Sequence, residues 1–77
     1  MIEEDVLIGH WYIDKINRDK CEVIDKCKLV CNNEIYTGIL INTEYKDDYE
    51  QIYYITSCFS IKDFIKHFEP LETIIEL

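Results

Sequence analysis

The chain has no alanine, two glycines and one proline among its 77 residues. Flexible linkers between domains are built mainly from glycine, serine and proline, so we expect a single domain that spans residues 1–77. A chain of this length buries only about 60% of the surface that it exposes when unfolded, which limits its stability. With 48% hydrophobic residues, the sequence nevertheless predicts a folded protein and not a disordered one.

Long apolar runs are also missing. No stretch approaches the roughly 20 consecutive apolar residues that a membrane-spanning helix needs. Residues 1–5 include three acids at a place where a secretory signal peptide has basic residues. We therefore expect a cytoplasmic protein with no membrane contact. The bias toward Ile, Lys, Asn, Asp, Glu and Tyr is typical of an AT-rich coding sequence, which suggests a bacterial or phage source.

Basic residues are half as frequent as acidic ones, 8 against 16, and the net charge is −8. A surplus of this sign repels phosphate and argues against direct nucleic-acid binding. Residues 1–5, 44–50 and 69–77 each carry −3, whereas residues 6–43 are neutral. Acids at chain ends and loop tips can simply keep a protein soluble. The functional interpretation is an acidic surface that docks on a basic partner protein.

Catalytic signatures are absent. The sequence has no glycine-rich phosphate loop and no local nucleophile motif. His67 lies in the last turn of an expected helix, where a cation complements the helix dipole. A pairing of His10 with a cysteine is the one nucleophilic arrangement that the residue types leave open. We expect no enzyme activity and no cofactor.

Four cysteines lie at positions 21, 27, 31 and 58. Without an export signal we expect reduced thiols, although an even number would form two disulfides in a secreted protein. A structural zinc is the other alternative. On a strand, Cys27 and Cys31 would lie on one face about 13 Å apart, too far to share one ion. We therefore expect buried thiols and no metal.

Hydrophobic patterning predicts four strands, one helix and a final strand, in the order 6–16, 21–31, 34–44, 50–57, 60–68 and 71–77. Asn32-Asn33 tolerates positive φ and predicts a tight turn, so the second and third strands should form a hairpin. In the fourth strand, Ile52 and Tyr54 should lie on the face opposite Tyr53 and Ile55.

The helix has the clearest signal. Ser60 is a good N-cap, and Asp63 follows three residues later as in a capping box. Phe59 and Phe64 are placed to form a hydrophobic staple, and Pro70 prevents the helix from continuing. One helical face is apolar, formed by Ile61, Phe64, Ile65 and Phe68.

These elements predict an α+β fold: a curved antiparallel sheet, or a small barrel, of about five strands with one short helix (about 60–68) before the last strand. The order of four meandering strands, a helical element and a fifth strand resembles that of the small SH3-like barrels. The helix here is longer than the single tight turn of that family. The acidic-aromatic peptide groove of signalling SH3 domains is not recognisable.

The loop after the third strand combines charge with aromatic residues, and we predict that it binds a partner. Tyrosine is enriched at interface hot spots because it offers a large contact area at low entropy cost. A hairpin connection does not require so many charges, so folding alone does not demand this composition. The predicted partner-binding residues are Glu44, Tyr45, Asp47, Asp48, Tyr49 and Glu50.

In size, charge and composition the chain resembles the small acidic proteins that phages use against host defences, including anti-CRISPR proteins. This resemblance implies an inhibitor of a nucleic-acid-handling protein that acts by steric block or nucleic-acid mimicry in the host cytosol. One alternative is a self-assembling structural module, a homodimer that buries the outward-facing Leu40 and Ile74. Another is a sponge for a small nucleotide bound in the neutral half of the chain.

Overall fold

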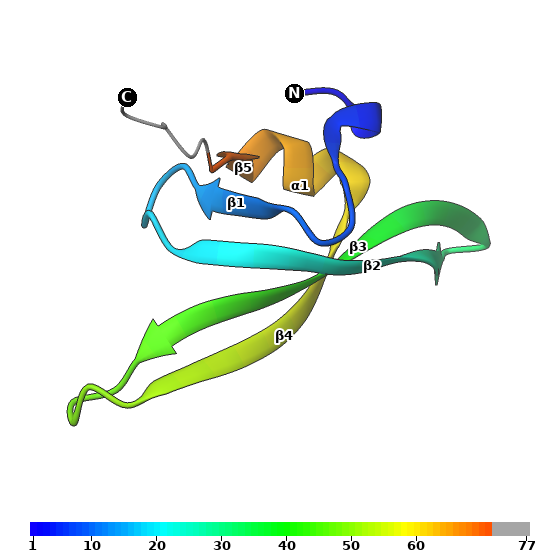
Figure 1. Cartoon of the computed structure of the whole chain (residues 1–77). Coiled ribbons are helices and arrows are strands. Elements are labelled where there is room, and N and C mark those ends of the chain that lie inside the picture. Colours follow the sequence, from blue (N-terminus) through cyan, green and yellow to red (C-terminus); the bar gives the residue numbers. More distant parts are fainter. Residues whose placement is uncertain (72–77) are drawn as a thin grey trace.

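The computed structural model describes residues 1–71 of the 77. Within this range the chain forms five strands, one α-helix and a short 3-10 helix (Figure 1). The elements are η1 (Glu3–Asp5), β1 (Trp11–Asp14), β2 (Lys20–Cys31), β3 (Glu34–Lys46), β4 (Ile52–Ser60), α1 (Ile61–His67) and β5 (Phe68–Pro70). The predicted hairpin of the second and third strands and the position of the helix are confirmed. The fourth strand was predicted at 50–57, but β4 continues to the N-cap of the helix.

All five strands belong to one antiparallel sheet with the order β4-β3-β2-β1-β5. Four strands follow one another as a meander, and β5 returns after the helix to pair with β1. Among the described residues, β4 and β5 are the two outer strands and do not pair, so the sheet is not closed. The structure therefore has the curved antiparallel sheet of the prediction and does not show a closed barrel.

A β-bulge bends β2. Its pairing with β3 shifts register between Val23, which is opposite Ile41, and Asp25, which is opposite Leu40. Because one extra residue lies in β2 at this point, the side chains after it change face. Val23 is buried, whereas Asp25 is exposed. The bend gives the sheet a curvature that alternation of apolar residues does not reveal.

One face of the sheet carries the core. The buried apolar side chains come from the N-terminal segment, the first three strands, α1 and β5: Val6, Tyr12, Cys21, Val23, Ile39, Ile41, Ile61, Phe64 and Phe68. Phe64 stacks on Phe68 with 4.7 Å between ring centroids and meets Tyr12 edge-on at 5.2 Å. The Tyr12 hydroxyl donates to the Asp5 carbonyl and accepts from Leu7 N–H, both at 2.8 Å, and so fixes the N-terminal segment to the core.

The helix begins as predicted. Ser60 is the N-cap, and its Oγ accepts a hydrogen bond from the Asp63 backbone N–H at 3.3 Å. The Phe59 ring packs against Phe68 at 5.4 Å, a contact with the far end of the helix that the staple did not predict. Phe68 is already in an extended conformation, so the helix ends before Pro70. Pro70 lies on an outer strand, where a missing N–H is tolerated.

The first and last strands differ from the prediction. Gly9 has φ of +84°, and its N–H bonds the Val23 carbonyl at 2.7 Å, so the chain turns there and β1 begins only at Trp11. The strand that pairs with β1 at the C-terminal side is Phe68–Pro70, directly after the helix. Most of the predicted strand 71–77, Ile74 included, lies outside the described residues.

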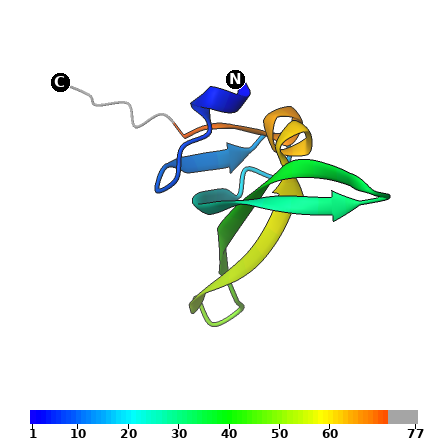
Figure 2. The same ribbon diagram turned by 90° about the vertical axis from the view of Figure 1, so that its right-hand side faces the viewer.

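Two hairpins project from the core, and the principal extents are 44 × 34 × 21 Å. The β2–β3 hairpin ends at Asn32-Asn33, both with positive φ, as the turn prediction requires. The β3–β4 hairpin points away from the layer that contains β1, β5 and α1 (Figure 2). No helix within residues 1–71 is long and apolar enough to cross a membrane.

A candidate partner-binding arm

The end of the β3–β4 hairpin, residues 44–55, contains all the predicted partner-binding residues and is called the arm below. A tight loop joins its strands. Asp47 N–H bonds the Gln51 carbonyl and Glu50 N–H bonds the Asp47 carbonyl, both at 3.0 Å. The Asp47 carboxylate accepts from Tyr49 N–H and Gln51 N–H, both at 2.8 Å. The interpretation that folding does not demand the composition of this loop is therefore wrong at Asp47, which holds the turn.

The other residues at the tip point into solvent. Tyr49 is 86% exposed, and Asp48 and Glu50 are also exposed. Within the described part of the chain, no side-chain hydrogen bond or ion pair engages Asp48 or Glu50. Two negative charges and one aromatic ring are thus available to a partner at the end of the molecule.

Behind the tip, tyrosines from both strands form ordered pairs. Tyr45 is directly opposite Tyr53, and their rings stack with 5.6 Å between centroids and 24° between planes. On the opposite face of the hairpin, the Tyr54 hydroxyl donates to the Glu44 carboxylate at 3.3 Å. Tyr53 and Tyr54 were missed by sequence reasoning, which assigned them only to a strand.

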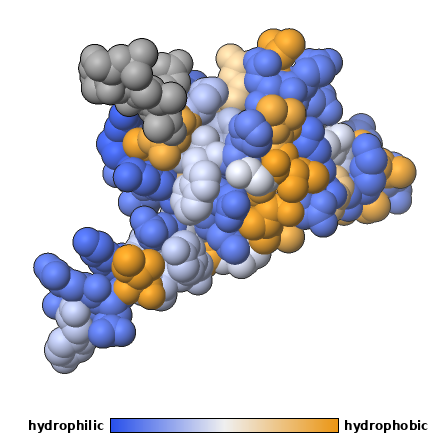
Figure 3. Space-filling view, viewed as in Figure 1, coloured by the Kyte–Doolittle hydropathy of each residue, from blue (hydrophilic) through white to orange (hydrophobic). Residues whose placement is uncertain are grey.

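The first half of β4 is apolar on both faces. The alternation of Ile52 and Tyr54 against Tyr53 and Ile55 is confirmed by the register, yet all four side chains are exposed. The arm extends beyond the core, so neither face is covered by another described element. Figure 3 shows hydrophilic residues gathered at the end of the arm and an apolar patch on the body of the molecule.

A cleft of about 180 Å³ separates the arm from the β1–β2 turn. It is lined by three residues at the β1–β2 turn, five of β3 and β4, and one of β5: Asp14, Asn17, Asp19, Ile41, Thr43, Tyr45, Ser57, Phe59 and Phe68. Tyr45 is its one lining residue from the arm. A polar, negatively charged cleft that contains a tyrosine ring suits a cationic side chain.

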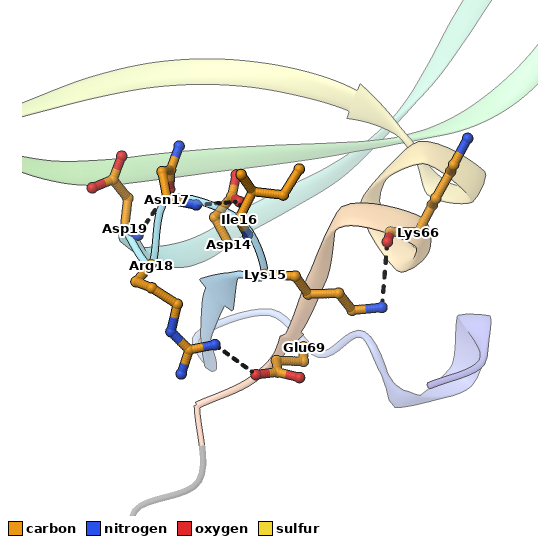
Figure 4. Close-up of polar contacts among 8 residues, drawn as sticks. All are labelled: Asp14, Lys15, Ile16, Asn17, Arg18, Asp19, Lys66 and Glu69. Atoms are coloured by element: carbon orange, nitrogen blue, oxygen red, sulfur yellow. Dashed lines mark hydrogen bonds and ion pairs between the residues drawn. The ribbon is translucent and has the colours of Figure 1, made fainter.

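The β1–β2 turn is held rigid by its own side chains. The Asp14 carboxylate accepts from Ile16 N–H at 2.8 Å and from Asn17 N–H at 3.2 Å. The Asn17 amide oxygen accepts from Asp19 N–H at 2.9 Å. These bonds place Asp14, Asn17 and Asp19 on the side of the turn that faces β3 and β4 (Figure 4).

The basic residues of this turn are directed elsewhere. Arg18 forms an ion pair with Glu69 at 3.1 Å. The Lys15 ammonium donates to the carbonyls of Ile65 and Lys66 at the end of α1. Figure 4 shows both side chains pointing away from Asp19, so the cleft keeps its negative charge.

The cysteines are free, but the prediction of buried thiols holds only for Cys21: Cys27 is half-buried, and Cys31 and Cys58 are exposed because they lie on strands outside the core. Cys27 of β2 and Cys58 of β4 have their Sγ atoms 3.7 Å apart. Partial desolvation raises the pKa of Cys58, and its hydrogen bond and charge interaction with Cys27 add to that rise. Burial also raises the pKa of Cys21 to about 12, with a further contribution from the charge of Asp14.

In residues 1–71, no three side chains of the metal-binding types gather into a ligand set. His10 and His67 lie outside the arm, at the approach to β1 and at the end of α1. The arm and the cleft together contain the predicted partner-binding residues and the acids of the β1–β2 turn, and we take them as the candidate site. No protein-family model, no curated protein sequence and no solved structure matches this chain.

Proposed function

We propose that this protein is a small acidic inhibitor that docks its arm and the adjoining cleft on the basic surface of a nucleic-acid-handling protein. The observation that carries the proposal is the stacked pair Tyr45–Tyr53 at the border of a cleft that also contains Asp14 and Asp19. Ordered aromatic rings lose little entropy on binding and make efficient anchors.

The cleft is suited to a lysine or arginine of the partner. Carboxylates of Asp14 and Asp19 provide charge-assisted hydrogen bonds, and the Tyr45 ring adds a cation–π contact. Asp48 and Glu50 at the tip steer a basic surface toward the arm over a longer range. The acids at the tip act over a long range and therefore set the association rate. The acids and the tyrosine in the cleft act at contact distance and therefore set the dissociation rate.

Inhibition follows because the basic surface of the partner protein ordinarily binds nucleic acid. A surface that holds phosphates also attracts an acidic arm, and an occupied site cannot bind nucleic acid. The net charge of −8 on 77 residues supports this mode and resembles that of phage proteins directed against host defence, acting in the host cytosol. We further propose that the bent β2 and the return of β5 to β1 make the fold a partly open relative of the SH3-like barrels.

The test begins with pull-down from a lysate of the native host and continues with competition. The purified captured protein should lose its nucleic acid when the wild-type chain is added. Tyr45→Ala and Asp19→Asn should each weaken this competition at least tenfold. Val30→Ala, on the exposed end of the other hairpin, is the matched control and should compete like wild type.

Two results would refute the proposal. The first is a captured protein that retains its nucleic acid at saturating concentrations of the wild-type chain. The second is undiminished competition by both Tyr45→Ala and Asp19→Asn. Circular dichroism of each variant verifies that the fold is retained, because both positions lie at the surface of the cleft.

A further inference from the structure

The two outer strands of the sheet differ in how they are protected. β5 has three residues, one of them Pro70, and its Glu69 forms the ion pair with Arg18. Short length, proline and charge are the features that prevent an outer strand from pairing with another chain. β4 has nine residues and none of these features. Within residues 1–71, no backbone hydrogen bond to its outer edge is present.

The composition of β4 is unusual for an unprotected strand. Ile52–Ser60 contains no charged residue, no proline and no glycine in a chain of net charge −8. Ile52, Tyr53, Tyr54 and Ile55 are exposed on both of its faces. An edge with this composition either aggregates or has a partner strand. Pairing would cover both the open backbone groups and the apolar side chains.

We propose that β4 pairs in antiparallel fashion with β4 of a second copy of this chain, about a two-fold axis at Thr56. In this register Thr56 lies opposite Thr56 of the second copy, and Tyr53 lies opposite Phe59. Threonine pairs and aromatic pairs are favourable cross-strand neighbours. No like charges are brought opposite one another, because the strand has none.

Charge complementarity supports a second copy as the occupant. The same register brings the acidic loop of one chain toward the first turn of α1 in the other chain, because each lies just beyond one end of β4. The loop holds Asp47, Asp48 and Glu50, whereas α1 has two lysines and one acid. The acids of each copy therefore meet the lysines of the other, on both sides of the axis.

The protected β5 also limits the assembly to two chains. After pairing through β4, both outer strands of the joined sheet would be β5, with its proline and ion pair. An isologous contact of this kind pairs β4, the outer strand that is not protected among the described residues. The assembly therefore closes as a dimer. This inference does not rest on the proposed inhibitor function, and the second copy and a basic partner compete for the acids at the tip.

The test uses opposite charges at the axis. In Thr56→Lys two lysines face each other, and in Thr56→Glu two glutamates do, so each variant alone should be monomeric. An equimolar mixture should restore the dimer, because lysine then faces glutamate. Val30→Lys and Val30→Glu are matched controls, since Val30 is an exposed strand residue far from β4. Both should dimerise like wild type.

Sedimentation equilibrium at about 100 μM, where mass action favours association, reads the outcome. A wild-type chain that is monomeric there would overturn the proposal. So would a Thr56→Lys variant that dimerises like wild type, or a mixture that stays monomeric. Thermal melts show whether each variant folds. If both substitutions unfold the chain, paramagnetic labels at Cys31 in a Cys27→Ser, Cys58→Ser variant report the same two-fold contact through the distance between the two labels. The absence of a measurable distance between labels would refute it.

Discussion

At the scale of single residues, Gly38 of β3 leaves room for two side chains of the neighbouring strand β2. A Cβ atom at this position would lie 2.8 Å from both Cys27 Sγ and Leu29 Cγ. Gly38→Ala should therefore destabilise the fold by about 1–3 kcal/mol through overpacking, as measured by urea unfolding. Adding Cys27→Ala should recover part of this loss. Equal stability of Gly38→Ala and wild type would contradict the close approach.

Cys21 should make stability depend on alkaline pH. Its pKa is raised from 9.0 to about 12, mainly by burial, so the folded state retains the thiol proton longer than the unfolded state does. Its contribution is complete below pH 9 and is lost as the pH rises toward 12. Urea midpoints measured from pH 8 to 11 should fall more steeply for wild type than for Cys21→Ala. Parallel slopes would show that Cys21 is not the responsible group.

Asp47 and Asp48 should behave differently although they are neighbours. Asp47→Ala removes the acceptor of two backbone N–H groups and should cost about 1–2 kcal/mol of stability. Asp47→Asn retains an acceptor oxygen and should stay close to wild type, which separates the hydrogen bonds from the charge. Asp48→Ala should change stability by less than about 0.5 kcal/mol. Melting curves of the three variants decide between these outcomes.

The composition of the 44–50 segment indicated a candidate site, but not the role of each residue in it. Charge and tyrosine content are visible in the sequence, whereas the bonds from Tyr49 and Gln51 to Asp47 depend on loop geometry. The contribution of Asp14 and Asp19 could not be predicted, because the β1–β2 turn reaches the arm only through the bend of the sheet. Hydrophobic periodicity contains no information on such long-range contacts.

At the scale of the elements, α1 is the part that local rules describe best. Its cap, its apolar face and its end all follow from residues within one segment. The start of β1 was harder to predict from the sequence, because it depends on the positive φ of Gly9 and on the hydrogen bond from Gly9 to β2. The five-stranded antiparallel sheet could be predicted from the order of strands and turns. Its open form could not, because closure depends on curvature and on distant strands.

The helix also gives a direct test of the core. Phe64 is fully buried and contacts Tyr12 and Phe68, so Phe64→Ala should cost about 3–5 kcal/mol. A loss of this size in a small domain should leave most of the population unfolded at 37 °C. The control is Val30→Ala on the exposed end of the β2–β3 hairpin, which should melt like wild type. A cooperative Phe64→Ala transition within a few degrees of wild type would contradict the core assignment.

At the scale of the whole molecule, the net charge makes the proposed partner contact sensitive to salt. The chain carries −8, so a basic partner is attracted over a long range. The screening length falls from about 10 Å at 0.1 M salt to about 3 Å at 1 M. Raising the salt concentration should therefore slow association with the captured partner in binding kinetics.

The charges at the tip of the arm should account for the effect of salt on the association rate. Asp48→Asn with Glu50→Gln should flatten the salt dependence of the association rate, because it removes the charges that steer the basic partner. The off-rate should change little, since neither side chain lies in the cleft. Tyr45→Ala should do the reverse and raise the off-rate at every salt concentration. If the double variant and Tyr45→Ala changed the same rate, the division between a steering tip and an anchoring cleft would be wrong.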